Sequence, residues 1–254
     1  MILLQTVAVA FAMFSALPVP QPTWNEKNMR YALCAFPLVG AVCGLVWLCL
    51  ALLPLPELLR AAGFCLAPVL ITGGIHLDGY ADTCDALASY GDTAKKQAIL
   101  QDPHCGAFAV IRLCTYFIAN LALCAALQPT IRAVSCMGIG FLLSRALSGW
   151  AIATLPLAKD TGLAHTFATA ANQKTVRWVL GVLAVLLMAA QALVGYVAGL
   201  VMAAAALLTL WRYAHVSKVQ FGGLSGDLAG WFLQKCEFWQ LAVLVTCQLL
   251  GVTV

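Results

Sequence analysis

Three carboxylates stand at helical spacing in the stretch TGGIHLDGYADTCD, residues 72–85. Asp78, Asp82 and Asp85 occupy positions i, i+4 and i+7, so a helix would project all three from one face. Like charges on one face repel each other, and a divalent cation would balance them. The alternative is a solvent-exposed acidic helix start, which the helix dipole favours. We favour a metal site because acidic residues are scarce in the rest of the chain.

The composition is that of a membrane protein. Of the 254 residues, 63% are hydrophobic and 9% are charged, against roughly 25% charged in globular proteins. Repeated apolar runs approach the ~20 residues of a transmembrane helix, and the alternation of a membrane barrel is not visible. Five of the ten acidic residues fall between positions 78 and 102, which points to a site. We therefore expect an all-α, polytopic membrane bundle forming one catalytic domain, residues 1–254, with roughly seven to eight membrane segments.

The apolar runs give the expected spans. They cover residues 31–53, 58–75, 107–127, 133–155 and 236–253. The apolar block after residue 177 is too long for one helix, and we expect it to fold back near Gln191–Gly195. Residues 1–17 are short for a span and either cross or re-enter. The eleven Cys lie mostly within apolar runs and lack zinc spacing, so we interpret them as small buried hydrophobes.

Four polar loops are expected on one side of the membrane: residues 18–30, 76–106, 156–177 and 212–235. They contain Lys27, Arg30, Lys95, Lys96, Lys159, Lys174, Arg177, Arg212, Lys218 and Lys235. The opposite side retains Arg60 and Arg132. This bias predicts that the four loops are cytoplasmic, and it explains the net charge of +4 without a nucleic-acid partner.

Two further carboxylates extend the candidate metal site. Asp102 lies in ILQDPHCGAF, where Asp-Pro indicates a turn; taken alone, an ordinary loop Asp is the simpler interpretation. Asp227 follows a turn whose Gly222, Gly223 and Gly226 would let backbone N–H groups face an anion at a helix N-terminus. The alternative is a glycine turn with Asp227 as the helix N-cap. The candidate metal ligands are Asp78, Asp82, Asp85, Asp102 and Asp227.

Arg145 and His76 join Asp82 as candidate catalytic residues. Arg145 lies deep in an expected span, where an ionisable residue costs about 2.5–3.5 kcal/mol and should face an anion in the bundle interior. We favour a substrate phosphate over a structural pairing with an Asp. His76 could act as a base or orient a ligand, and an interfacial His without such a role is an equal alternative. Glu237, ten residues beyond Asp227, should point away from the site.

Carboxylates, glycines and arginines on one membrane face together suggest phosphoryl-group chemistry. Mg²⁺ usually takes one or two carboxylates and keeps its other positions for water and substrate phosphates. It would stabilise the charge that leaves a diphosphate. The chain has no Walker loop, dinucleotide fingerprint, nucleophile elbow or zinc-binding helix.

The chain resembles the cobalamin synthases, the adenosylcobinamide-GDP ribazoletransferases. The likeness is carried by LPVP at 17–20, FPLVGAVCG at 36–44, TGGIHLDGYADTCDAL at 72–87, DPHCG at 102–106, Ser144-Arg145 and GGLSGD at 222–227. The resemblance implies a Mg²⁺-dependent enzyme of the cell inner membrane that joins α-ribazole, or its 5′-phosphate, to adenosylcobinamide-GDP and releases GMP. We count Gly74 with the later glycines as a candidate substrate contact. Homo-oligomers, or association with other corrinoid-pathway enzymes, remain open.

Some positions depart from the family pattern. Gln101 and His104 stand where a basic residue before Asp102 and an Arg after it are usual. Gln234 stands where many members have a carboxylate, so we do not count it as a ligand. These changes put secondary phosphate contacts in doubt, and leave the reaction as implied.

Three other functions compete with this interpretation. A membrane prenyltransferase would carry Asn-Asp-x-x-Asp, which does not occur. A CDP-alcohol phosphotransferase signature would begin like Asp78-Gly79, but Asp82 stands where an Arg should follow Ala81. A cation transporter would place its carboxylates near the bilayer midplane, whereas these lie at segment ends.

Overall fold

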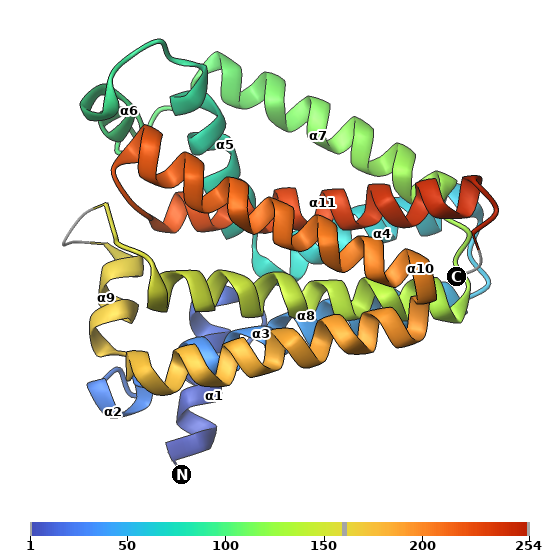
Figure 1. Cartoon of the computed structure of the whole chain (residues 1–254), viewed down its shortest axis with the longest axis horizontal. Helices are drawn as coiled ribbons and strands as arrows, with labels where there is room; N and C mark the ends of the chain where they lie inside the picture. The colour runs from blue at the N-terminus through green and yellow to red at the C-terminus, as the bar shows by residue number, and fades with distance from the viewer. Residues whose placement is uncertain (1, 159–161, 253–254) are drawn as a thin grey trace.

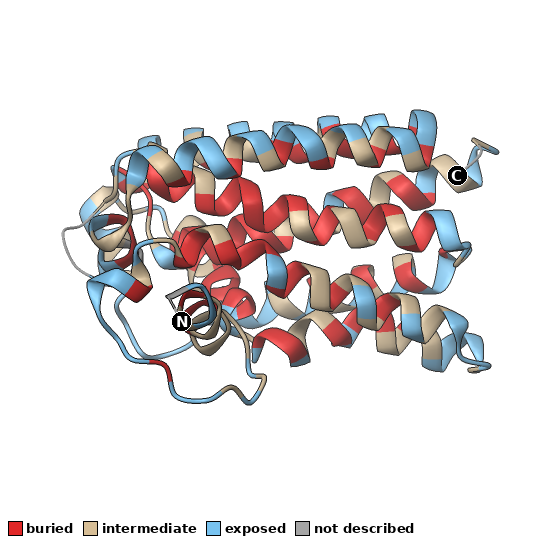
Figure 2. Cartoon of the chain, turned by 90° about the horizontal axis from the view of Figure 1, so that it is seen from below, coloured by how far each residue is buried: buried red, intermediate tan, exposed pale blue. Residues whose placement is uncertain are grey.

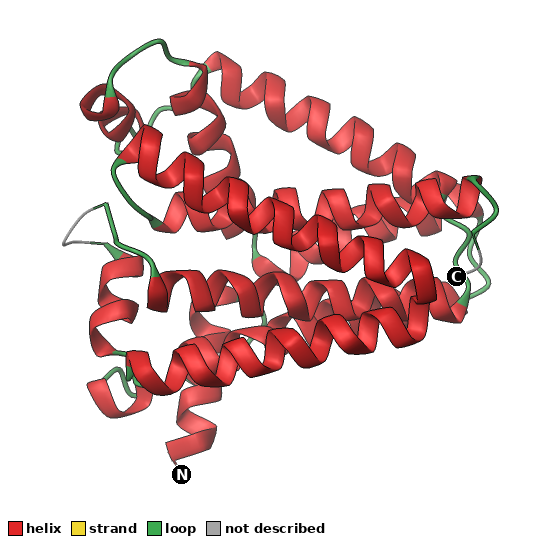
Figure 3. Cartoon of the chain, in the orientation of Figure 1, coloured by secondary structure: helices red, strands yellow, loops and turns green. Residues whose placement is uncertain are grey.

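The expected all-α architecture is confirmed in the computed structural model, which describes residues 2–158 and 162–252. Figure 3 shows helices joined by short connections; among the described residues the only β pairing is an isolated bridge between Leu157 and Leu224. The helices are α1 (Ile2–Phe14), α2 (Glu26–Met29), α3 (Ala32–Leu52), α4 (Glu57–Thr72), α5 (Ile75–Ala88), α6 (Thr93–Ile99), α7 (Ala107–Ala126), α8 (Ile131–Thr154), α9 (Leu163–Ala170), α10 (Gln173–Phe221) and α11 (Gly226–Leu249).

Four helices, α3, α7, α8 and α10, are each long and apolar enough to cross a membrane. A fifth span results if α4 and α5, which meet at 95°, are counted as one broken span. This is fewer than the seven to eight segments expected. α1 is a short helix of 13 residues, and polar residues such as Lys235, Glu237 and Gln240 lower the hydropathy of α11. The remaining difference lies in α10, which is counted once although it has two arms.

The two arms of α10 form a helical hairpin. The backbone leaves the helical conformation at Tyr196, with φ 48° and ψ −125°, one residue beyond the range expected for the fold-back. Figure 1 shows the second arm returning alongside the first. A Cβ atom on Gly199 would lie 1.8 Å from the carbonyl oxygen of Gln191, so the close approach at this corner requires glycine.

The connections gather at two ends of the bundle (Figure 1). One end contains α2, α6, α9 and the turn between α10 and α11; we call it the polar end, because it holds the four expected polar loops. The opposite end holds the α3–α4 and α7–α8 connections and the break in α10. Lys159, one of the ten basic residues assigned to the polar loops, lies outside the described residues. The grouping of the loops therefore agrees with the pattern of polar stretches along the chain.

Burial follows the arrangement of a membrane bundle. Figure 2 shows buried residues on the faces where helices meet and exposed residues on the outer faces. Large apolar side chains such as Ile118, Leu193 and Leu200 are exposed there, as a surface in contact with lipid tails allows. The buried apolar residues form one cluster that draws on most of the helices.

Candidate active site

The acidic stretch forms one helix, as its spacing predicted. α5 spans Ile75–Ala88 and carries Asp78, Asp82 and Asp85. It follows two glycines with positive φ, Gly73 at 65° and Gly74 at 80°, a conformation that glycine adopts without steric cost. The chain turns here by 95°, so α5 runs across the direction of the long helices, near the polar end (Figure 1).

α5 crosses the first turns of α11 with the two backbones in contact. A Cβ atom on Gly79 would lie 2.7 Å from the carbonyl oxygen of Asp227, and one on Gly230 would lie 2.7 Å from that of His76. Side chains at either glycine would separate the helices. The crossing therefore brings the α5 carboxylates to the start of α11, where Asp227 lies.

The carboxylates share one electrostatic environment. The pKa of Asp82 is raised to about 6, first by burial and then by the negative charges of Asp78, Asp227 and Asp85. The part of this rise that comes from the neighbouring charges means that the carboxylates repel one another when they are ionised. Among the described residues no group of three His, Cys, Asp or Glu side chains is arranged to hold a metal ion. The donor set still fits Mg²⁺, which needs only one or two carboxylates beside water and substrate oxygens.

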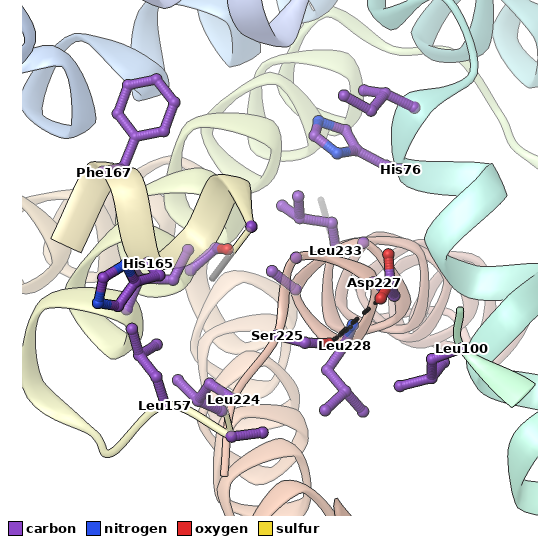
Figure 4. A pocket seen from close by; sticks show the side chains of 18 of the residues that line it. His76, Leu100, Leu157, His165, Phe167, Leu224, Ser225, Asp227, Leu228 and Leu233 are labelled. Carbon is purple, nitrogen blue, oxygen red and sulfur yellow. Dashed lines mark hydrogen bonds between the residues drawn. The ribbon is translucent and has the colours of Figure 1, made fainter. Parts of the chain in front are cut away.

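Asp78 and Asp227 line a cavity of about 500 Å³ near the polar end. Its wall is mostly apolar, and it includes residues of α1, α3, α5, α6, α8, α9, α10 and α11. Figure 4 shows Asp227 and Ser225 at the start of α11 on one side, with His165 across from them. An apolar cleft with few convergent polar groups is the usual form of a small-molecule site.

His76 lines the same cavity and is buried. Its Nε2 atom has no hydrogen-bond partner among the described residues. Burial, and after it the charge of Arg145, lowers the pKa of His76 to about 3. The ring is therefore neutral near pH 7, which makes it a weak base and a better hydrogen-bonding group.

Asp85 and Asp102 have partners outside the cavity. Asp85 accepts a hydrogen bond of 3.3 Å from the backbone N–H of Ala109 and therefore stabilises the N-terminus of α7. Asp102 is exposed and accepts hydrogen bonds from the backbone N–H and the ring of His104, which lower its pKa. Neither carboxylate lines the cavity.

The glycines assigned to substrate binding have different roles. Gly222 ends α10 with φ 77°, and Gly223 packs on the backbone of Leu157, 2.5 Å from where its Cβ would be. Gly226 alone of this group lines the cavity, with open space where a Cβ would stand. Gly74 begins α5 and does not line the cavity.

The alternative in which Asp227 caps α11 is wrong. Ser225 is the N-cap, and its hydroxyl accepts the backbone N–H of Leu228 at 3.2 Å. Asp227 lies in the first turn of the helix. The helix therefore does not depend on Asp227 for its cap.

Arg145 pairs with a carboxylate inside the bundle. As expected it is buried and faces an anion, but the partner is Glu237 on α11, at 2.5 Å. Ser144 also donates a hydrogen bond of 2.9 Å to Glu237. The structure thus supports the structural pairing, with Glu in place of Asp, over the phosphate contact that we favoured. Glu237 does not line the cavity that Asp227 lines, in agreement with its spacing.

Several cavity residues lay outside the sequence-based candidates. Phe14, Phe36, Phe167, His165 and Ser148 all line the cavity. Ser148 lies three residues after Arg145, so helical periodicity placed it one turn along α8, but no motif marked it. The aromatic residues come from three separate helices, so no local pattern joins them.

Gln234, one of the departures from the family pattern, is buried and accepts a hydrogen bond of 2.6 Å from the hydroxyl of Tyr116. This contact ties α11 to α7. It gives position 234 a packing role in this chain, in agreement with leaving it out of the ligand set.

The fold and the cavity define a polytopic helical membrane protein whose acidic site opens near one end of the bundle. The family model described as cobalamin-5-phosphate synthase matches residues 6–245. The chain therefore belongs to the cobalamin-5-phosphate synthase family.

Relatives agree with this family. An adenosylcobinamide-GDP ribazoletransferase of Lachnoclostridium phytofermentans is 41% identical over 92% of this chain and 90% of its own length. Proteins of the same name from Geobacillus kaustophilus and Ectopseudomonas mendocina are 30% and 32% identical over 96% and 90% of this chain, and 97% and 93% of their own. No solved structure matches the chain. These matches give no support to the prenyltransferase or CDP-alcohol phosphotransferase alternatives.

Proposed function

We propose that this protein transfers adenosylcobinamide phosphate from adenosylcobinamide-GDP to α-ribazole, or to α-ribazole 5′-phosphate, and releases GMP. The product is adenosylcobalamin or its 5′-phosphate. Membership of the cobalamin-5-phosphate synthase family and the names of the relatives support this reaction. The structural observation that carries the proposal is the apolar cavity whose wall contains Asp78 and Asp227.

In this reaction a ribose hydroxyl oxygen attacks the phosphorus next to cobinamide. A new P–O bond forms, the P–O bond to GMP breaks, and the hydroxyl proton must leave. We assign this proton to the carboxylate of Asp78, because it lines the cavity in which the attacking hydroxyl must lie. The cavity also includes the first turn of α11, Gly226 and Asp227, where the positive end of the helix dipole favours a phosphate.

The proposed metal ligands are two carboxylates, Asp82 on α5 and Asp227 on α11. Their mutual repulsion at Asp82 supports a bound cation, and Mg²⁺, when bound, would neutralise the diphosphate and stabilise the departing GMP. Asp85 and Asp102 are weaker candidates because each already accepts hydrogen bonds from its own neighbours. His76 is better placed to bind substrate than to take a proton, since its ring is a weak base.

We further propose that the protein lies in the cell inner membrane with its polar end in the cytoplasm. The excess of Lys and Arg in the loops of that end supports this orientation. Both soluble substrates would then reach the cavity from the cytoplasmic side.

The reaction is tested with the purified protein in lipid vesicles, supplied with adenosylcobinamide-GDP and α-ribazole, with Mg²⁺ or with a chelator. We expect Mg²⁺-dependent formation of adenosylcobalamin and an equal amount of GMP. Turnover in the presence of chelator would overturn the metal assignment. Folded protein that forms neither product would overturn the reaction, and isoprenoid diphosphates would be tested next.

A further inference from the structure

The cavity has an aromatic side that the chemistry at the carboxylates does not use. Phe14 of α1, Phe36 of α3 and Phe167 of α9 all line it, together with His76. Their rings contact one another: the centroids of Phe14 and Phe36 are 4.3 Å apart, those of Phe14 and Phe167 5.4 Å, and those of Phe36 and His76 5.7 Å. Figure 4 shows Phe167 and His76 on either side of the upper part of the pocket, with Asp227 below them.

Two cavity-lining residues each carry a buried polar atom without a partner. Nε2 of His76, a residue 6% exposed, and Oγ of Ser148, a residue 0% exposed, have no hydrogen-bond partner among the described residues. Both residues line the cavity. An unsatisfied buried polar group costs about 1–3 kcal/mol, so these two atoms are expected to meet a ligand in the working enzyme.

We propose that this aromatic side binds the flat base of the acceptor nucleoside, that Ser148 donates a hydrogen bond to the base and that His76 forms one with the attached ribose; the proposal rests on the proposed function. Aromatic rings at these separations suit offset or edge contacts with a planar ligand. With the base among the phenylalanines, the attached ribose would extend toward Asp78 and Asp227, where the attacking hydroxyl is needed.

The small number of polar atoms decides which base fits. The benzimidazole of ribazole has one free ring nitrogen, which Oγ–H of Ser148 can satisfy. The guanine of the donor has several donors and acceptors, most of which would stay unpaired against phenylalanine rings, at the cost of a buried polar group each. The aromatic side therefore distinguishes the acceptor from the donor.

The test is steady-state kinetics and binding with the full-length protein in lipid vesicles. Ser148→Ala and Phe36→Leu are expected to raise KM for α-ribazole about tenfold, equivalent to the loss of one good contact. KM for adenosylcobinamide-GDP should stay within about twofold. Equilibrium binding of α-ribazole without the donor, followed by benzimidazole fluorescence, should weaken by the same factor.

The chain offers matched controls. Ser217 is also a buried serine whose Oγ has no partner among the described residues, and Phe64 is also a buried phenylalanine stacked on an aromatic ring, but neither lines the cavity. Ser217→Ala and Phe64→Leu should leave α-ribazole binding unchanged. Size-exclusion chromatography checks that each variant is folded, and Ser148→Ala decides the question if Phe36→Leu does not fold.

Unchanged α-ribazole binding in folded Ser148→Ala, or a rise confined to KM for adenosylcobinamide-GDP, would overturn this assignment while leaving the proposed function intact. A wild-type protein that forms no product would overturn the proposed function instead, and the assignment with it. The first failure is observed in the Ser148→Ala variant and the second in the wild-type protein, so the two can be distinguished.

Discussion

Asp82 is the residue whose chemistry depends most on its neighbours. Its own helix supplies Asp78 and Asp85, and α11 supplies Asp227. The first two follow from spacing, because residues three or four apart on a helix share a face. The third depends on how α5 packs on α11, which no local pattern encodes. The resulting repulsion is the physical reason to expect a cation at this point of the molecule.

Asp82→Asn should abolish product formation while leaving the protein inserted in the membrane. It should also raise the melting temperature of the metal-free protein. The raised pKa means that ionisation of Asp82 destabilises the folded protein. The gain in melting temperature on substitution therefore appears as pH rises above 3.8, the ordinary pKa of the group, and is complete above about 6. Removing this destabilisation contributes about 1 kcal/mol after allowance for solvent screening, which corresponds to a rise of roughly 2–4 °C in melting temperature.

The control is Asp92→Asn. Asp92 caps α6, and Asn caps a helix equally well, so activity and melting temperature should not change. Wild-type turnover in Asp82→Asn would exclude Asp82 from the metal site.

The pair Arg145–Glu237 gives a second prediction at this scale. Removing one partner of a buried ion pair leaves an uncompensated charge and costs about 3–5 kcal/mol. Arg145→Gln and Glu237→Gln should therefore both lower the melting temperature strongly, and the double variant should recover part of the loss. KM for adenosylcobinamide-GDP should be similar in the double variant and the wild type. If Arg145→Gln had a normal melting temperature but a raised KM, the result would instead support a contact between Arg145 and a substrate phosphate.

Among the elements, α5 and α11 determine the geometry of the site. Each contributes a glycine at their crossing, and these glycines allow the backbones to touch. The helix α5 itself was predictable from the spacing of its carboxylates. Its direction was not, because it follows from the two left-handed glycines before it and from the contact with α11.

Gly79→Ala tests this crossing. The new Cβ would stand 2.7 Å from the carbonyl oxygen of Asp227, so the helices must move apart, at a cost of about 1–3 kcal/mol. Because displacement of catalytic groups by about 1 Å can cost up to 10²-fold in rate, we expect activity to fall at least tenfold. Activity and melting temperature are measured on the purified variant in lipid.

Gly181→Ala on α10 is the matched control. Its Cβ would meet Trp150 at 3.6 Å, an ordinary contact, and alanine favours a helix by roughly 0.5–1 kcal/mol over glycine. Stability should be equal or higher and activity unchanged. If Gly79→Ala behaves in the same way, the crossing does not position the carboxylates.

The same distinction between local and tertiary contacts explains what else could be predicted. The spans at 31–53, 107–127 and 133–155 agree with α3, α7 and α8 because apolar runs of that length have one structure in a membrane. Asp85 and Asp102 were assigned by type and proximity in sequence, yet Asp85 contacts the start of α7 and Asp102 contacts His104. These partners depend on how a loop closes, which residue type does not reveal.

At the scale of the whole molecule, one end of the bundle carries the cavity and the polar loops. The basic loops and the cavity are therefore expected on the same side of the membrane, and the positive-inside bias predicts that this side is the cytoplasm. Cys105 reports on this directly. It is exposed in the loop before α7, at the polar end, so a charged thiol reagent can reach it from water.

A membrane-impermeant maleimide should label Cys105 in inverted inner-membrane vesicles and in broken cells, but not in intact spheroplasts. Cys49 and Cys114 are also exposed, but they lie on spanning helices. Lipid around these helices disfavours the thiolate, which is the form that reacts with maleimide. Cys105→Ser should therefore remove most of the labelling. Gln128→Cys, in the α7–α8 connection at the opposite end, should react with the reverse preference when made in the Cys105→Ser background. Labelling of Cys105 in intact spheroplasts would place the cavity on the periplasmic side, away from cytoplasmic nucleotides, and the proposed access of both substrates would then be wrong.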